Sequence, residues 1–292
     1  MRAVVVPVRR LDAAKTRLSP LLTPAERGVV ALAMARDVIA ACAAQPDWRT
    51  WVVSADPAVL AAADRAGAHP VPEEATGLRT AVGQAERRAR ALGVSELAVV
   101  LADLPWITPS ALRRALEPAD AVVGVRARSD GGTNALVRRP PTVVPALFGR
   151  ASFARHQEAA ARAGRTLRRV ESEELAFDLD RPDDVRRLLE DGRGGHTVEV
   201  CSELGVAARL DQRSPVVDRS REGEMQGTIK EFDPESGTGV LLLDDGTEVA
   251  IDPASTEGSE IRYLRLGQRV DFDVDDDGQR KLARGLHIVT FA

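Results

Sequence analysis

The sequence predicts an α/β protein with a mainly parallel sheet, followed by a small second domain built from strands alone. Over residues 1–190, short β-branched runs alternate with longer segments of helical character, which is the pattern of βαβ units. From Met225 onward, apolar and polar residues alternate with a period of two between tight turns, which is typical of a small β-barrel. Residues 225–292 hold 7 Lys and Arg against 14 Asp and Glu, whereas residues 1–224 hold 33 against 30. A net charge of −7 beside one of +3 indicates two separate units.

The elements of the first unit have recognisable local signals. Residues 3–8, AVVVPV, are β-branched and flanked by polar residues, so they predict a buried strand. Thr23-Pro24 predicts the start of a helix that runs to about Ala43, because Thr is a good N-cap and Pro fits the first helical position. The chain predicts further strands at 50–54, 97–101, 121–125 and 134–137, and further helices at 57–66, 78–92, 109–116, 152–164 and 181–190.

Residues 191–224 separate the two units. Gly, Arg, Ser and Asp dominate there without a sustained period, so we expect a linker between a domain at 1–190 and a barrel at 225–292. The two cysteines, Cys42 and Cys201, lie far apart and lack metal-ligand spacing, which fits a reducing compartment. The apolar run at the N-terminus is too short for a secretory signal, and no stretch approaches the roughly eighteen apolar residues of a membrane span. We therefore expect a cytoplasmic protein without a membrane partner.

A basic loop follows the first predicted strand. In VRRLDAAKTRL, four cations (Arg9, Arg10, Lys15 and Arg17) come directly after the strand. Ligands of parallel sheets bind at the carboxyl ends of the strands, and charge-assisted hydrogen bonds to phosphate are strong. The loop therefore suits a polyanion, although its composition alone fits a solvated basic turn equally well.

Two acidic segments offer ligands for a cation. Asp103 follows the strand at 97–101, where Mg²⁺ would take one or two carboxylates together with phosphate oxygens. Asp178 and Asp180 alternate in FDLDRPDD, so they point to the same face and need a metal or cations to offset their repulsion. The alternatives are a turn-capping role for Asp103 and a helix N-cap role for Asp180.

Two further segments suit a small anion. The glycines of Gly131-Gly132-Thr133-Asn134 let backbone N–H groups approach an anion and Thr133 adds a hydroxyl, although a hairpin turn is the commoner meaning. In FGRASFARH, Ser152 is expected as the N-cap of a helix whose first turn could bind an anion, and His156 is expected to be structural. Together, the cations, carboxylates and anion-binding groups indicate phosphoryl or nucleotidyl transfer without a covalent intermediate.

Five segments together resemble the CofC/FbiD family of guanylyltransferases, which act in coenzyme F-420 biosynthesis. They are PVRRLDAAKTRLSPLLTPAER, VVLADLPWIT, GGTNALV, FGRASFARH and FDLDRPDDV, and they occur within residues 1–190 in the order of the family. The resemblance implies a Rossmann-like (GT-A-like) nucleotidyltransferase fold that transfers GMP from GTP to a three-carbon phosphate, with release of diphosphate. Arg outnumbers Lys by 37 to 3, which is typical of a GC-rich genome and favours phosphoenolpyruvate over 2-phospho-L-lactate or 3-phospho-D-glycerate.

The resemblance also implies roles for the matching residues. Lys15 and Asp103 would be the catalytic residues, and Asp103, Asp178 and Asp180 would hold Mg²⁺. The family often has Lys where Arg9 stands and usually has Asn where Arg79 stands. The resemblance further implies which residues would bind the two substrates. The acceptor would be bound by Thr133, Gly149 and Ser152, and the GTP by Arg9, Lys15, Arg17 and Arg79. A nucleotidyltransferase that uses CTP or another nucleotide is the alternative enzyme, but its usual Leu-Ala-Gly-Gly loop is absent after the first strand.

Residues 225–292 resemble a cold-shock domain of the OB type, because MQGTIKEFDPESGTGVLLLDDG follows the opening of that barrel. Such domains stack single-stranded bases on surface aromatics over a basic face. In this chain Thr238, Val240 and Val249 fill the expected aromatic positions, and the acidic surplus would repel phosphate. We therefore expect a barrel without nucleic-acid binding that serves packing, solubility or a homodimer. A regulator that binds single strands is the alternative from another class.

Overall fold

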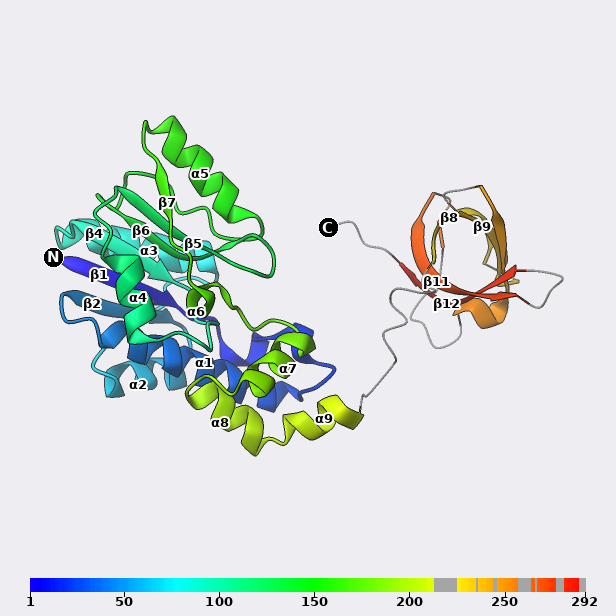
Figure 1. Ribbon diagram of the computed structural model, residues 1–292, viewed down its shortest axis with the longest axis horizontal. Coiled ribbons are helices and arrows are strands. Elements are labelled where there is room, and N and C mark those ends of the chain that lie inside the picture. Colours follow the sequence, from blue (N-terminus) through cyan, green and yellow to red (C-terminus); the bar gives the residue numbers. More distant parts are fainter. Residues whose placement is uncertain are drawn as a thin grey trace. The chain divides into compact units, whose positions relative to one another are not determined.

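The computed structural model divides the chain into two compact units, Met1–Gln212 and Arg213–Ala292, which are coloured blue to yellow-green and orange to red in Figure 1. The structure describes residues 1–212, 225–234, 236–243, 246–256, 264–265, 267–276 and 281–288. No helix within these ranges combines the length and the apolar character that a membrane crossing requires.

The first unit contains a seven-stranded sheet with the order β3-β2-β1-β4-β6-β5-β7. All neighbouring strands run parallel except β6, which is antiparallel to both β4 and β5. This parallel-rich sheet confirms the predicted α/β class. The strands are β1 (Arg2–Pro7), β2 (Trp48–Ser54), β3 (His69–Pro72), β4 (Glu96–Val100), β5 (Val122–Arg126), β6 (Thr133–Arg138) and β7 (Leu167–Arg169).

Helices pack on both faces of this sheet. Successive residues of β1 point in opposite directions, so they contact different helices. Val4 and Val6 lie in one buried cluster with α1 and α4, whereas Val5 lies in another with α3. Thr23 begins α1 as predicted, with a capping box to Glu26. The helices are α1 (Pro24–Ala43), α2 (Pro57–Arg65), α3 (Leu78–Ala91), α4 (Pro109–Leu116), α5 (Ser152–Arg162), α6 (Glu173–Ala176), α7 (Pro182–Asp191), α8 (His196–Glu203) and α9 (Val206–Gln212).

The linker prediction is wrong for residues 191–212, which contain α8 and α9 and belong to the first unit. The carboxylate of Asp37 on α1 accepts hydrogen bonds from the backbone N–H groups of His196 at 2.8 Å and Thr197 at 3.0 Å, and so caps α8. Arg209 of α9 binds both carboxylate oxygens of Glu26, at 2.7 and 2.9 Å. These tertiary contacts stabilise two helices whose own sequences carry little periodic signal.

Two predicted helix caps also differ from the structure. Ala151, in the left-handed conformation with φ 52°, is the N-cap of α5, and Ser152 is the first helical residue. The Ser152 hydroxyl points instead to Thr133. The N-cap of α7 is Arg181, not Asp180. The carboxylate of Asp184 accepts hydrogen bonds from the backbone N–H groups of both residues. The Asp180 side chain is therefore available to the candidate site.

The second unit is a closed barrel with the strand order β10-β12-β11-β8-β9. The pairing is antiparallel except between β10 and β12. Val249 is fully buried in the barrel core, so the expectation that it occupies a surface stacking position is wrong, whereas Thr238 is exposed. The strands are β8 (Met225–Asp233), β9 (Thr238–Leu243), β10 (Glu248–Ile251), β11 (Arg269–Asp276) and β12 (Lys281–Ile288).

Candidate active site

A cavity of about 500 Å³ lies at the carboxyl ends of β1 and β4, the neighbouring strands at the centre of the sheet. The residues that follow each strand line it, which is the usual place for a ligand on a parallel sheet. Of the residues predicted for this site, those that line the cavity are Arg9, Lys15, Arg17, Asp103 and Asp180. Among the other residues that line it, Glu73, Gly77, Asp130 and Arg150 were not predicted from the sequence as site residues.

Lys15 lies between two carboxylates in this cavity. Its Nζ donates to Asp103 Oδ2 at 3.0 Å and to Asp180 Oδ1 at 2.7 Å, and its side chain is only 11% exposed. Burial acts to lower the pKa of the ammonium, but the two carboxylates outweigh burial and raise that pKa above its ordinary value. Lys15 is therefore a charged group at the centre of the site.

The backbone around Lys15 consists of two short 3₁₀ turns, Leu11–Ala13 and Thr16–Leu18. Lys15 joins them in the left-handed conformation, with φ 50° and ψ 44°. A residue other than Gly adopts this conformation only where its surroundings hold it there, and such residues are common at functional sites. The turn holds the backbone of Lys15 at the end of the sheet.

A backbone contact joins the two acidic segments. The N–H of Leu179 donates to the carbonyl of Asp103 at 3.1 Å, so Asp178 and Asp180 flank the end of β4. Burial opposes ionisation of Asp180, but Lys15 and then Arg17 outweigh burial and lower its pKa. Arg17 Nη1 lies 3.5 Å from Asp180 Oδ2.

Asp178 has a different environment. It is 7% exposed, and the hydroxyl of Ser129 donates to its Oδ2. Burial raises the pKa of Asp178, and the charges of Asp103 and Asp180 raise it further despite the Ser129 hydrogen bond. The negative charges of Asp103 and Asp180 therefore act on Asp178, and the three carboxylates interact electrostatically.

Two carboxylate oxygens in this cluster suit a hard cation. Asp103 Oδ1 and Asp178 Oδ1 are buried and have no hydrogen-bond partner within the described residues. Buried acceptors without a partner are rare, and oxygen atoms are the ligands that Mg²⁺ prefers. However, the described part of the chain contains no group of three or more His, Cys, Asp or Glu side chains already arranged around a metal position. The Lys15 ammonium occupies the space between Asp103 and Asp180 instead.

The hydroxyls predicted for acceptor binding belong to a buried chain of hydrogen bonds. Ser152 Oγ donates to Thr133 Oγ1 at 3.1 Å, and Thr133 Oγ1 lies 2.9 Å from His156 Nδ1. The N–H of Leu147 donates to His156 Nε2 at 2.7 Å, so in the neutral ring Nδ1 carries the hydrogen and donates to Thr133. Thr133 thus accepts two hydrogen bonds and keeps its own hydroxyl hydrogen to donate.

The pH dependence of stability tests the neutral state of His156. Burial first, and then Arg138 and Arg155, lower the pKa of this histidine to about 4 from 6.5. The unfolded chain therefore takes up the proton first as the pH falls. The free energy of unfolding should be unaffected by His156 above pH 6.5 and should fall by about 3 kcal/mol between pH 6.5 and 4.

Urea unfolding between pH 4 and 7 would measure this loss. The variant His156→Gln has no titrating ring, so its stability should fall less steeply over the same range than that of the unsubstituted chain. Equal pH dependence in the two proteins would show that His156 does not resist protonation.

Two glycine loops lie against each other beside the cavity. The N–H of Ala151 donates to the Asp130 carbonyl at 3.2 Å, and that of Phe153 donates to the Gly131 carbonyl at 3.3 Å. Gly149 has a φ of 127°, which favours glycine at this position. The neighbours Asp130 and Arg150 line the cavity, whereas Thr133, Gly149 and Ser152 are not among its lining residues. Arg150 lies inside the FGRASF segment, so the motif could have indicated it.

The predicted nucleotide-binding arginines differ in position. Arg9 and Arg17 line the cavity, and Arg9 has no ion pair in the ranges that the structure describes. Arg10 pairs with Asp12 at 2.8 Å and does not line the cavity. Arg79 is an exposed residue in the first turn of α3, and its neighbour Leu78 lines the cavity.

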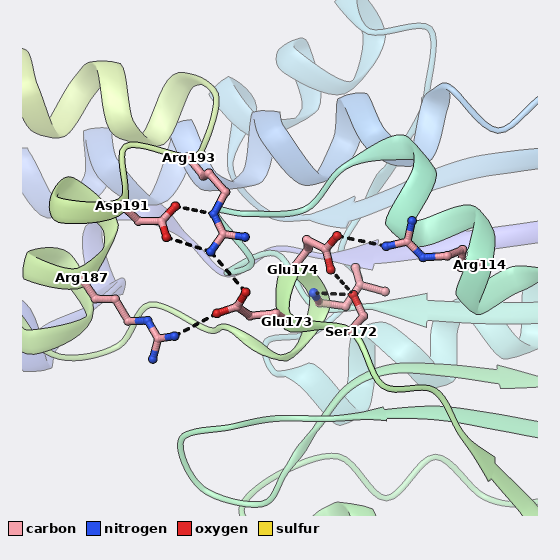
Figure 2. A network of polar contacts seen from close by, with 8 residues as sticks. Arg114, Ser172, Glu173, Glu174, Arg187, Asp191 and Arg193 are labelled. Carbon is pink, nitrogen blue, oxygen red and sulfur yellow. Dashed lines mark hydrogen bonds and ion pairs between the residues drawn. The ribbon is translucent and has the colours of Figure 1, made fainter.

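A network of charged residues holds α6, which precedes the segment that carries Asp178 and Asp180 (Figure 2). Glu173 pairs with Arg187 at 3.0 Å and with Arg193 at 3.2 Å, and Glu174 pairs with Arg114 at 3.0 Å. Arg193 also pairs with Asp191.

Stacked rings extend this network to the end of β4. The rings of Trp106 and Phe177 stack with their centroids 3.9 Å apart, and the Arg193 guanidinium lies 4.4 Å from the Trp106 centroid. Trp106 follows Asp103 by three residues, and Phe177 precedes Asp178. The stack therefore fixes the two acidic segments against each other.

The chain is similar to known proteins in sequence and in fold. The sequence family described as guanylyl transferase CofC like matches residues 1–221. Phosphoenolpyruvate guanylyltransferase of Rubrobacter xylanophilus is 42% identical over 193 residues, 64% of this chain and 93% of that protein. The 2-phospho-L-lactate guanylyltransferase of Haloferax volcanii is 39% identical over 219 residues, 75% of this chain and 98% of that protein.

A solved structure shares the fold of the first unit. It comes from Desulfovibrio desulfuricans, is named after nucleotide-diphospho-sugar transferases, and superposes with a TM-score of 0.58 at 16% identity. The match covers 73% of this chain and 98% of that one. At this identity the similarity is one of fold.

Proposed function

The chain belongs to the family of CofC-like guanylyltransferases, and on that premise we propose that it transfers GMP from GTP to phosphoenolpyruvate in coenzyme F-420 biosynthesis. The observation that carries this proposal is the cavity at the ends of β1 and β4, which joins unpaired or exposed cations to an acidic cluster. Relatives that act on phosphoenolpyruvate and relatives that act on 2-phospho-L-lactate both match. The second acceptor, or 3-phospho-D-glycerate, is therefore the alternative.

The cavity residues suggest how the chain would perform the transfer. Arg9, Lys15 and Arg17 would bind the phosphates of GTP, and Arg79 would lie nearer the base or ribose. A phosphate oxygen of the acceptor would attack the α-phosphorus. The new P–O bond forms as the bond to the bridging oxygen of the β-phosphate breaks, and diphosphate leaves. The chain contributes position and positive charge.

Mg²⁺ is the cofactor that the acidic cluster would hold. Asp103, Asp178 and Asp180 are the candidate ligands, and the two partnerless oxygens of Asp103 and Asp178 support this assignment. When bound, the ion would neutralise charge on the phosphates.

The acceptor would lie against the two glycine loops. Support comes from the remaining hydroxyl hydrogen of Thr133, the open backbone at Gly149, and the link from Ser152 to Thr133. Arg150 adds a cation in the same loop that faces the cavity. A three-carbon acid with a phosphate carries negative charge at both ends, which matches this surface.

A GTP assay with each three-carbon acceptor tests the proposed function. The unstable product would be trapped by coupling to a downstream deazaflavin acceptor, and diphosphate release would be measured in parallel. Turnover with GTP and phosphoenolpyruvate is expected. Turnover with CTP, and none with any three-carbon acceptor and GTP, would overturn the proposal.

Substituting Arg150 tests the placement of the acceptor. The variant Arg150→Ala should raise the KM for the acceptor about tenfold, because it removes one charge-assisted contact, and should leave the KM for GTP within about twofold. Arg162→Ala on α5 is the matched control, since Arg162 makes only an exposed pair with Glu158. A rise in the KM for GTP alone would move Arg150 to the nucleotide side of the cavity.

The barrel is proposed to be cold-shock-like without nucleic-acid binding, and to serve packing, solubility or a homodimer. Its five strands form a closed barrel, and a five-stranded barrel supports the proposal of an OB-type domain. Its charge of −7 opposes binding to phosphate. Filter binding of single-stranded RNA at low salt should therefore show only weak retention, and tight retention would favour a nucleic-acid-binding regulator.

A further inference from the structure

Lys15 can interact with both the candidate metal site and the GTP phosphates. Lys15 donates to Asp103 Oδ2 and Asp180 Oδ1, which are carboxylates of the candidate metal site, and it also lines the cavity proposed for the GTP phosphates. A divalent ion on the partnerless Oδ1 of Asp103 would share that carboxylate with the ammonium on Oδ2, and an ion on Oδ1 of Asp180 would have to displace the ammonium. The two cations therefore compete for the same carboxylates.

The cluster needs a cation whether or not a substrate is present. Three carboxylates that interact at short range, of which Asp178 is almost fully buried, repel one another without positive charge. Lys15 supplies that charge from within the chain. Arg17 cannot replace it, because its guanidinium is 65% exposed and reaches only Asp180, at 3.5 Å.

We propose that Lys15 is a place-holder cation, which occupies the position of the divalent ion in the free protein and moves to the GTP phosphates when the metal and the nucleotide enter. This inference rests on the proposed function. Its consequence is an order of binding: the metal alone meets an ammonium already seated between Asp103 and Asp180, whereas the metal with GTP offers that ammonium a new anionic partner. Nucleotide should therefore tighten the binding of metal to this site.

The local structure suits such a movement. Lys15 has a flexible four-carbon stem and a compact charge with three donors, of which two are used by the carboxylates. Its backbone lies between two short turns and outside any α-helix or strand. Phosphates bound by Arg9 and Arg17 would lie in the same cavity as the Lys15 side chain.

Titration of the full chain with Mn²⁺ alone, without nucleotide, tests the proposal by electron paramagnetic resonance. The variant Lys15→Gln removes the charge and leaves a polar side chain that is one bond shorter, and it should bind Mn²⁺ at least about tenfold more tightly than the unsubstituted chain. Lys15→Arg should bind no more tightly. Lys15→Met provides a second neutral variant if the Gln variant does not fold.

Arg17→Gln is the matched control, because it removes a nearby charge without freeing the shared oxygens, and should change Mn²⁺ affinity by less than about threefold. A non-hydrolysable GTP analogue should tighten Mn²⁺ binding to the unsubstituted chain far more than to Lys15→Gln. Equal Mn²⁺ affinity of the Gln variant and the unsubstituted chain, or no Mn²⁺ binding by either, would overturn the place-holder role. These measurements involve no acceptor and no turnover, so a failed guanylyltransferase assay would not decide them.

Discussion

Replacing Asp103 with Asn is expected to lower kcat by about 10²–10³-fold, the range for loss of a major electrostatic contribution to a transition state. Oδ2 of Asp103 accepts a hydrogen bond from the Lys15 ammonium, and Oδ1 is buried without a partner. Both oxygens therefore belong to the site. The amide removes the charge that holds Lys15 and the candidate metal. Single-turnover transfer of GMP at saturating GTP and Mg²⁺ would measure the effect on the chemical step.

Asp120→Asn is the matched control for this substitution. Asp120 pairs with Arg168 on the surface, so its removal should leave kcat within about twofold. The two variants should also unfold at similar urea concentrations, which would separate a loss of chemistry from a loss of folding. Near-normal activity of Asp103→Asn would mean that the metal and the reacting phosphate lie elsewhere.

Several residues predicted for this site lie together because they follow neighbouring strands. The basic loop and Asp103 come after β1 and β4, which are neighbours in the sheet, so their carboxyl ends meet. The FDLD segment was predicted as a pair of like charges in need of a cation. A single backbone hydrogen bond, from Leu179 to Asp103, brings that pair to the same place.

The place of Lys15 between two carboxylates could not be predicted from the sequence. It depends on a left-handed residue between two 3₁₀ turns, and neither periodicity nor composition encodes such a conformation. The insertion of antiparallel β6 between β4 and β5 escaped prediction for a related reason, since strand order is set by tertiary pairing. The short elements β3, β7 and α6 are too brief for a periodic signal.

Shortening the chain should show the importance of the helices that the sequence did not predict. A chain that ends at residue 190 should not fold cooperatively, whereas one that ends at residue 212 should. Three fully or almost fully buried apolar side chains are lost in the shorter chain, and burial of a large apolar side chain contributes about 1.5–3 kcal/mol. These are Cys201, Val206 and Leu210. Their loss approaches the whole stability of a typical domain, about 5–15 kcal/mol.

Contacts on the other side of this interface add to the loss. Leu18, Leu22 and Met34 belong to the same buried cluster and would lose part of their cover. Glu26 would lose Arg209, whose hydrogen bonds lower the pKa of that carboxyl to about 2. Far-ultraviolet circular dichroism during urea unfolding would compare the two chains, and a cooperative transition of the 190-residue chain near that of the 212-residue chain would contradict the prediction.

The same shortening should abolish transfer of GMP even if some helix survives. Leu18 closes the 3₁₀ turn that follows Lys15, so the cluster that α8 and α9 cover also supports the backbone that carries Lys15. Arg193, which lies on Trp106 and pairs with Glu173, is removed as well, and with it a support of the segment that carries Asp178 and Asp180. The 212-residue chain retains all of these contacts. It should therefore transfer GMP at a rate within about twofold of the full chain, since every cavity residue and its support lie in the first unit.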